Sequence, residues 1–167
     1  MKSKIGVSEK NNAKTSSNGA KLLEMILGQL THLGGLVFYI IITIFVLTIG
    51  KIIIFEELLV VLVTIMVVAI IIRMLYHKER PEKKKYETIF ERIDSSSFPS
   101  LHSMRAVALA IIIGNSFAAH LQKIFLGIIA ILVIYSRIKL KKHYIEDALL
   151  GAILGAGIAL LVLLVLK

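Results

Sequence analysis

The stretch Ala148–Leu166, ALLGAILGAGIALLVLLVL, contains no charged residue and is long enough to cross a lipid bilayer as a helix. Four apolar stretches precede it, at Leu36–Phe55, Leu58–Tyr76, Leu101–Leu121 and Ile124–Ser136. A span needs about 20 mostly apolar residues, so the short fourth stretch is expected to tilt little or to borrow flanking residues. The sequence therefore predicts an all-α integral membrane bundle of about five transmembrane helices.

The residues before the first predicted span divide into two parts. Residues 1–20 are polar and rich in Lys, Ser and Asn, without the apolar core of a signal peptide, which predicts a disordered basic tail. Residues 21–35 place apolar residues at helical spacing between polar ones. This pattern is typical of an amphipathic helix that lies at the membrane interface. Residues 21–167 are then expected to form one transmembrane domain.

The composition excludes several functional classes. Of the 167 residues, 57% are hydrophobic, and the mean hydropathy is +0.84, well above the values typical of soluble domains. The absence of cysteine excludes disulfide frameworks, thiol nucleophiles and Cys-based zinc sites. In so apolar a chain, the net charge of +9 indicates basic loops of a membrane protein. Only 7% of the residues are aromatic and there is no Trp, so few side chains could stack on bases. A nucleic-acid-binding surface is not expected.

Potentially reactive residues are concentrated in three segments, 73–81, 98–103 and 136–147, which the predicted spans place on one side of the membrane. Their arginines offer paired donors for phosphate oxygens, and a helix start in the second segment offers free backbone amides for an anion. His143 and Asp147 are four residues apart. The carboxylate is therefore expected to hold the imidazole in one tautomer and to leave its other nitrogen free to attack.

These segments resemble the signature of the type 2 phosphatidic acid phosphatase (PAP2) family, which also includes vanadium haloperoxidases and bacterial acid phosphatases. That signature reads K-x6-R-P, P-S-G-H and S-R-x5-H-x3-D. The third motif matches at all its fixed positions, which are Ser136, Arg137, His143 and Asp147. The second motif has Leu101 in place of glycine, and the first has Arg73 in place of lysine. The resemblance covers residues 73–147 and implies that residues 21–167 form a transmembrane lipid phosphatase without a metal or another cofactor.

The resemblance also implies a role for each matched position. His143 would be the nucleophile that forms a phosphohistidine, Asp147 would orient it, and His102 would protonate the leaving oxygen. The implied phosphate-binding residues are Arg73, Arg80, Ser100, Leu101 (through its amide) and Arg137. The expected partners are the bilayer and a lipid phosphate or diphosphate substrate. Polyprenyl diphosphate, phosphatidate and phosphatidylglycerophosphate all fit.

Several alternatives stay open at this point. The chain could be a small anion transporter or channel, or a catalytically degenerate family member that only binds; Leu101 and Arg73 motivate the second alternative. Arg105 is interpreted as a residue that reaches the lipid headgroups. Ser95–Ser97 are interpreted as loop residues, with a role in binding phosphate as the less favoured alternative. Most Lys and Arg residues lie on the side of the reactive segments, which favours a cytoplasmic site, whereas the family resemblance favours the outer face. Sidedness and oligomeric state are left open.

Overall fold

The computed structural model describes residues 19, 21–82 and 87–166, and it leaves out the side chains of residues 89 and 90. All regular structure in these residues is helical, as predicted. The expected basic tail, residues 1–20, lies outside the described residues except for position 19.

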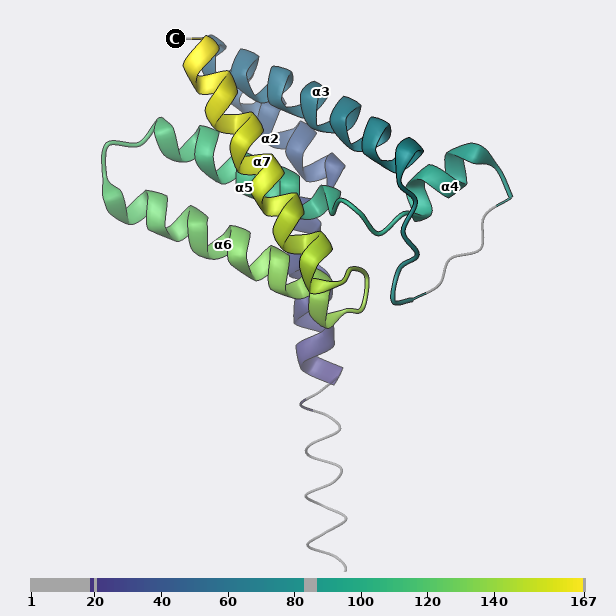
Figure 1. Cartoon of the computed structure of the whole chain (residues 1–167). Helices are drawn as coiled ribbons and strands as arrows, with labels where there is room; N and C mark the ends of the chain where they lie inside the picture. The colour runs from purple at the N-terminus through teal and green to yellow at the C-terminus, as the bar shows by residue number, and fades with distance from the viewer. Residues whose placement is uncertain (1–18, 20, 83–86, 167) are drawn as a thin grey trace, which may run out of the picture.

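A helical segment over 21–31 leads into the short helix η1. The remaining elements are η1 (His32–Gly34), α2 (Leu36–Thr48), α3 (Ile52–Leu75), α4 (Ile89–Ser95), α5 (Leu101–Asn115), α6 (His120–Lys139) and α7 (Ile145–Val165). Helix α5 is central, because it packs against α7, α6, α3, α2 and η1. Figure 1 shows α4 set apart from the bundle, beyond the end of α3, while the N-terminal helical segment projects away from the bundle.

Three of the described helices, α3, α6 and α7, are long and apolar enough to cross a membrane. The helices Lys21–Gly34 and Leu36–Thr48, taken together, are also long and apolar enough for one span, although they are bent by 50° relative to each other. Helix α5 is apolar but has only 15 residues. The chain is thus an integral membrane protein. By length and composition, the described residues provide three spans, or four if the bent pair counts as one. The predicted count of five is not confirmed.

Several predicted boundaries were wrong. The predicted span Leu36–Phe55 is divided at Gly50, whose φ of 74° is a left-handed conformation that glycine adopts readily, and α3 begins two residues later. The third helix ends at Asn115 rather than at Leu121, and α6 extends beyond Ile124–Ser136 at both ends. Hydropathy does not mark the polar residues that continue a helix beyond its apolar part.

The core lies where α5 meets α3 and α7. Its buried residues include Leu58, Val61 and Ile65 from α3, Met104, Ala108 and Ile112 from α5, and Ala159 and Val162 from α7. Two glycines of α7 permit the close approach of α5: a Cβ at Gly151 would lie 2.8 Å from the carbonyl oxygen of Ser100, and a Cβ at Gly155 would collide with the backbone of Met104. Small residues allow such close helix packing within a membrane.

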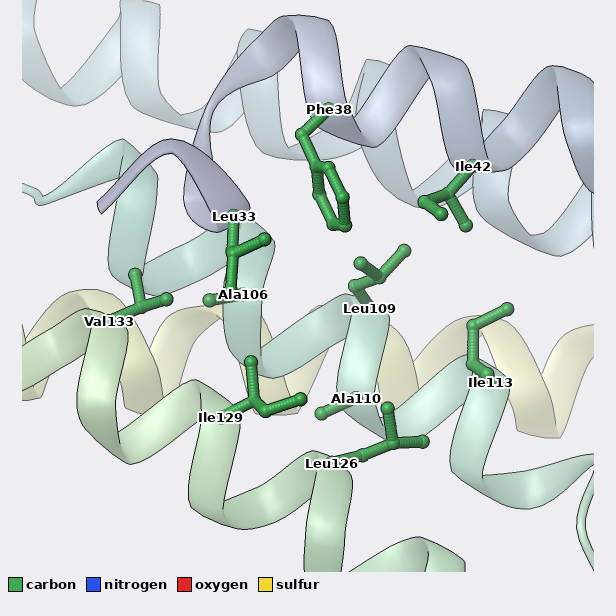
Figure 2. A pocket seen from close by; sticks show the side chains of 10 residues that line it. All are labelled: Leu33, Phe38, Ile42, Ala106, Leu109, Ala110, Ile113, Leu126, Ile129 and Val133. Carbon is green, nitrogen blue, oxygen red and sulfur yellow. The ribbon is translucent and has the colours of Figure 1, made fainter. Parts of the chain in front are cut away.

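An apolar cavity of about 150 Å³ lies between α2, α5 and α6 (Figure 2). Phe38 and Ile42 from α2 face Leu109 and Ile113 from α5 across it. All the side chains that line it are apolar, and an apolar cavity of this size typically stays free of water. It is therefore unsuited to a charged group, and the polar chemistry of the chain lies elsewhere.

The two glycines Gly155 and Gly157 provide a test of the α5–α7 contact. Gly155→Ala should lower the free energy of unfolding by about 1–3 kcal/mol, because the new methyl group has to displace the backbone of Met104. Gly157→Ala is the matched control, since a Cβ there meets nothing within 4 Å. Thermal unfolding of the purified variants in detergent measures both effects. Equal stability of the two variants would contradict this packing.

Candidate active site

A polar cavity of about 330 Å³ lies at the N-terminal end of α5, where α3, α6 and the loops before α5 and α7 meet. It is lined by Leu36, Met66, Arg73, Arg80, Asp94, Leu101, His102, Arg105, Arg137 and His143. The structure therefore brings together most of the site residues that the sequence predicts. The exceptions are Ser100 and Asp147, which lie behind the lining.

Two of the arginines bind α4 and the loop that leads from it to α5. Arg73, in the last turn of α3, donates from Nη1 to the carbonyl oxygen of Ile93 (3.2 Å) and from Nη2 to that of Pro99 (2.9 Å). Arg80 donates from Nη2 to the carbonyl oxygen of Asp94 (2.6 Å). Because these acceptors are uncharged peptide groups, the bonds position the guanidinium groups without neutralising them.

The other two arginines contact the segment before α2. Arg137, in the last turn of α6, donates from Nη1 to Thr31 Oγ1 (3.0 Å). Arg105 donates from Nε to the carbonyl oxygen of Gly34 (3.0 Å) and is only 5% exposed. The interpretation of Arg105 as a headgroup-reaching residue was wrong, because its side chain is enclosed in the bundle. Its position three residues after His102, on the same helix face, is the sequence signal that could have placed it at the site.

The cavity has unused capacity to bind an anion. Among the residues that the structure describes, Nε of Arg73, of Arg80 and of Arg137 is buried without a hydrogen-bond partner. Asp94 is the one carboxylate in the lining, beside four arginines. Buried positive groups are costly unless they are paired, so an oxyanion that accepts from these donors would be stabilised here. No group of three or more His, Cys, Asp or Glu side chains in the described ranges is arranged to hold a metal ion.

His143 lies between α6 and α7, is 3% exposed, and places Nδ1 2.6 Å from the carbonyl oxygen of Ser97. A carbonyl oxygen only accepts, so Nδ1 carries the proton and Nε2 keeps a free lone pair. Burial and the charge of Arg137 lower the pKa of His143 to about 3, although the bond to Ser97 opposes the shift. The imidazole is therefore neutral and nucleophilic at neutral pH.

Asp147 does not hold His143 in the way that the sequence spacing predicts. Its Oδ2 accepts from Ser97 Oγ (2.6 Å), and its Oδ1 accepts from Lys78 Nζ (2.7 Å). The reason is the helix boundary: α7 begins at Ile145, so His143 lies outside the helix and the four-residue spacing is not helical. Ser97 therefore links the two predicted residues, through its carbonyl group to one and its hydroxyl group to the other. Ser97 was interpreted as a loop residue or, less favoured, as a phosphate contact, and its link between His143 and Asp147 was not expected.

Ser100 caps α5 rather than lining the cavity. Its Oγ accepts from Ser103 Oγ (3.0 Å), and its backbone N–H donates to the carbonyl oxygen of Asp147 (3.2 Å). The first amides of a helix have no acceptor within it. Those of Leu101 and His102, at the start of α5, belong to residues that line the cavity.

The protonation state of His143 can be tested directly. Nitrogen-15 NMR of the histidine-labelled protein in detergent should show His143 as a neutral imidazole protonated at Nδ1 at pH 5.5. With a pKa of about 3, Nε2 becomes protonated only at much lower pH. His143→Gln assigns the resonance by removing it. An imidazolium at pH 5.5, or a neutral ring protonated at Nε2, would contradict this geometry.

Comparison with known proteins identifies the family of the chain. The family model of the PAP2 superfamily matches residues 32–167, while no curated protein matches the chain significantly. The fold is similar to that of LpxE from Aquifex aeolicus, at 23% identity and a TM-score of 0.72, over 85% of this chain and 86% of that one. It is also similar to a transmembrane PAP2 type phosphatidylglycerolphosphate phosphatase from Bacillus subtilis, at 26% identity and a TM-score of 0.68, over 84% and 75% of the two chains. The family match and the likeness to a membrane phosphatase support a phosphatase activity. The chain therefore belongs to the PAP2 superfamily, and it is an integral membrane protein.

Proposed function

We propose that the chain hydrolyses the phosphate or diphosphate end of a membrane lipid through a phosphohistidine at His143. The observation that carries this proposal is a buried, neutral imidazole with a free Nε2 that lines the same cavity as four arginines. Membership of the PAP2 superfamily and the likeness to a membrane phosphatase support it.

The proposed reaction has two steps. Nε2 of His143 attacks phosphorus, and the bond to the leaving oxygen breaks while His102, which the bound phosphate dianion would keep protonated, donates a proton to that oxygen. His102 then takes a proton from water as the water attacks the phosphohistidine, which releases phosphate and restores the neutral imidazole. Throughout, Nδ1 of His143 donates to the carbonyl oxygen of Ser97, so that the ring keeps its orientation.

The proposed phosphate-binding groups are those with unused donors. Arg73, Arg80 and Arg137 offer buried Nε–H groups to the phosphoryl oxygens and to the charge that grows during transfer. The backbone N–H of Leu101 adds a further donor. Leucine supplies this donor as well as the glycine of the PAP2 signature would, because it belongs to the backbone. Ser100 contributes by capping α5 and so holding that amide in place.

The proposed substrate is a lipid because apolar side chains share the cavity with the arginines. Leu36, Met66 and Leu101 line its wall, and we expect this wall to face the bilayer. A phosphate end can bind the arginines while the hydrocarbon chain stays in an apolar environment. Phosphatidylglycerophosphate is the first candidate, because the Bacillus subtilis protein is a phosphatidylglycerolphosphate phosphatase; polyprenyl diphosphate and phosphatidate are the others.

Phosphate release by the purified full-length chain in detergent with EDTA tests the proposal against all three lipids. We expect turnover in EDTA that falls at least about a thousandfold in His143→Ala, since the covalent route is lost. His120→Ala is the control, because His120 is exposed at the start of α6. Phosphate binding without turnover would instead favour an anion transporter or a degenerate binding protein. Turnover that appears only with added metal would contradict a metal-independent reaction.

Arg73 provides a second test, because the PAP2 signature has lysine at this position. Its two terminal nitrogens reach two different carbonyl groups, those of Ile93 and Pro99. An ammonium group is more compact and lacks this planar fork. Arg73→Lys should therefore lower kcat/KM at least about tenfold, as expected for the loss of one hydrogen bond from a charged donor. Unchanged kcat/KM on the best lipid would show that the loop does not depend on this guanidinium.

A further inference from the structure

We propose that Lys78 is a positioning residue, which fixes Asp147 and through it the Ser97 group that orients His143. Lys78 occupies none of the fixed positions of the three signature motifs; it is one of the variable residues between Arg73 and Arg80. It also lies outside the lining of the polar cavity, so it has no direct contact with a substrate there. This inference rests on the proposed function, in which His143 is the nucleophile.

The side chain of Lys78 binds two consecutive acidic residues of α7. Its Nζ lies 2.7 Å from Asp147 Oδ1 and 2.8 Å from Glu146 Oε1. Asp147 is completely buried, whereas the side chain of Glu146 is 63% exposed. Nζ also lies 4.8 Å from the centre of the Tyr144 ring, within the range of a cation–π contact. The Asp147 contact is the one that carries the argument, because an exposed ion pair contributes little.

The backbone of Lys78 binds the loop before α5, at Ser96 and Ser97. Its carbonyl oxygen accepts from the N–H of Ser97 (2.7 Å), and its own N–H donates to Ser96 Oγ (3.4 Å). Ser97 in turn donates from Oγ to Asp147 Oδ2 (2.6 Å). Lys78, Ser97 and Asp147 thus form a closed ring of contacts. The carbonyl oxygen that accepts the hydrogen bond from His143 belongs to one member of this ring, Ser97.

Removal of the Lys78 charge has a predictable consequence. A fully buried carboxylate that loses its cation is strongly destabilised, so it takes up a proton or turns toward another donor. Either change alters the bond from Ser97 Oγ and releases the Ser97 carbonyl group from its present direction. The His143 ring would then lose its orientation, while the arginines that bind phosphate would keep theirs. The proposal therefore predicts a loss in kcat with little change in KM.

Steady-state kinetics of Lys78→Met, Lys78→Arg and Lys142→Met test this inference. We expect Lys78→Met to lower kcat at least about tenfold, which corresponds to about 1.4 kcal/mol in the barrier, with KM within about twofold. Lys78→Arg, which keeps the charge, should recover most of the loss. Lys142→Met is the matched control, because it removes a lysine whose side chain pairs with Glu82 rather than with Asp147. An unchanged kcat in Lys78→Met, or an equal loss in Lys142→Met, would overturn the proposal.

A double-mutant cycle keeps the test valid if Lys78→Met folds poorly. In an Asp147→Asn background the buried charge is absent, so Lys78→Met should cause little further loss. Full additivity of the two effects would contradict coupling through Asp147. Nitrogen-15 NMR of His143 separates this inference from the proposed function: the Nδ1-protonated signal should shift or broaden in Lys78→Met but not in Lys142→Met, even if no lipid is hydrolysed. An unchanged signal in both would overturn the positioning role.

Discussion

Hydrogen bonds from buried arginines to backbone carbonyl groups are the interactions on which the polar end of this molecule depends. Arg73 fixes the loop before α5, and Arg105 fixes η1 against α5. A Cβ at Gly34 would lie 2.8 Å from the carbonyl oxygen of His102, which shows how closely η1 packs there. The bonds of Arg73 and Arg105 go to uncharged acceptors, so these bonds do not neutralise the two side chains. A single set of bonds thus builds the cavity wall and keeps the cavity ready for a phosphate group.

Ser97 connects that wall to the proposed nucleophile. It binds His143 through its carbonyl group and Asp147 through its hydroxyl group, and its N–H donates to Lys78. In this arrangement the buried carboxylate acts on the imidazole through the loop rather than by direct contact. The imidazole remains neutral chiefly because it is buried, and the positive charge of Arg137 further disfavours the imidazolium. Neutrality is the property that a nucleophilic nitrogen requires.

The sequence was sufficient to predict the helical membrane fold, because apolar length is a local signal. The resemblance to the PAP2 signature pointed to most of the polar residues that line the cavity. It could not predict the helix boundaries, since Gly50 breaks an apolar run that hydropathy alone treats as continuous. Nor could it predict the link through Ser97, which depends on where α7 starts relative to His143. Arg105 was misinterpreted because a lone arginine near a helix end is equally compatible with the headgroups and with the bundle interior. These errors share one cause: they depend on tertiary placement that no single segment contains.

The most direct test of this account is the structure of the protein with orthovanadate, an analogue of the transferring phosphoryl group. The account predicts vanadium bonded to Nε2 of His143, with oxygens beside Arg73, Arg80 and Arg137 and with Nδ1 still bound to the Ser97 carbonyl group. Vanadate bound away from His143, or bonded to Nδ1 after the Ser97 contact has broken, would contradict the assignment of His143 as the nucleophile and of Ser97 as the group that orients it.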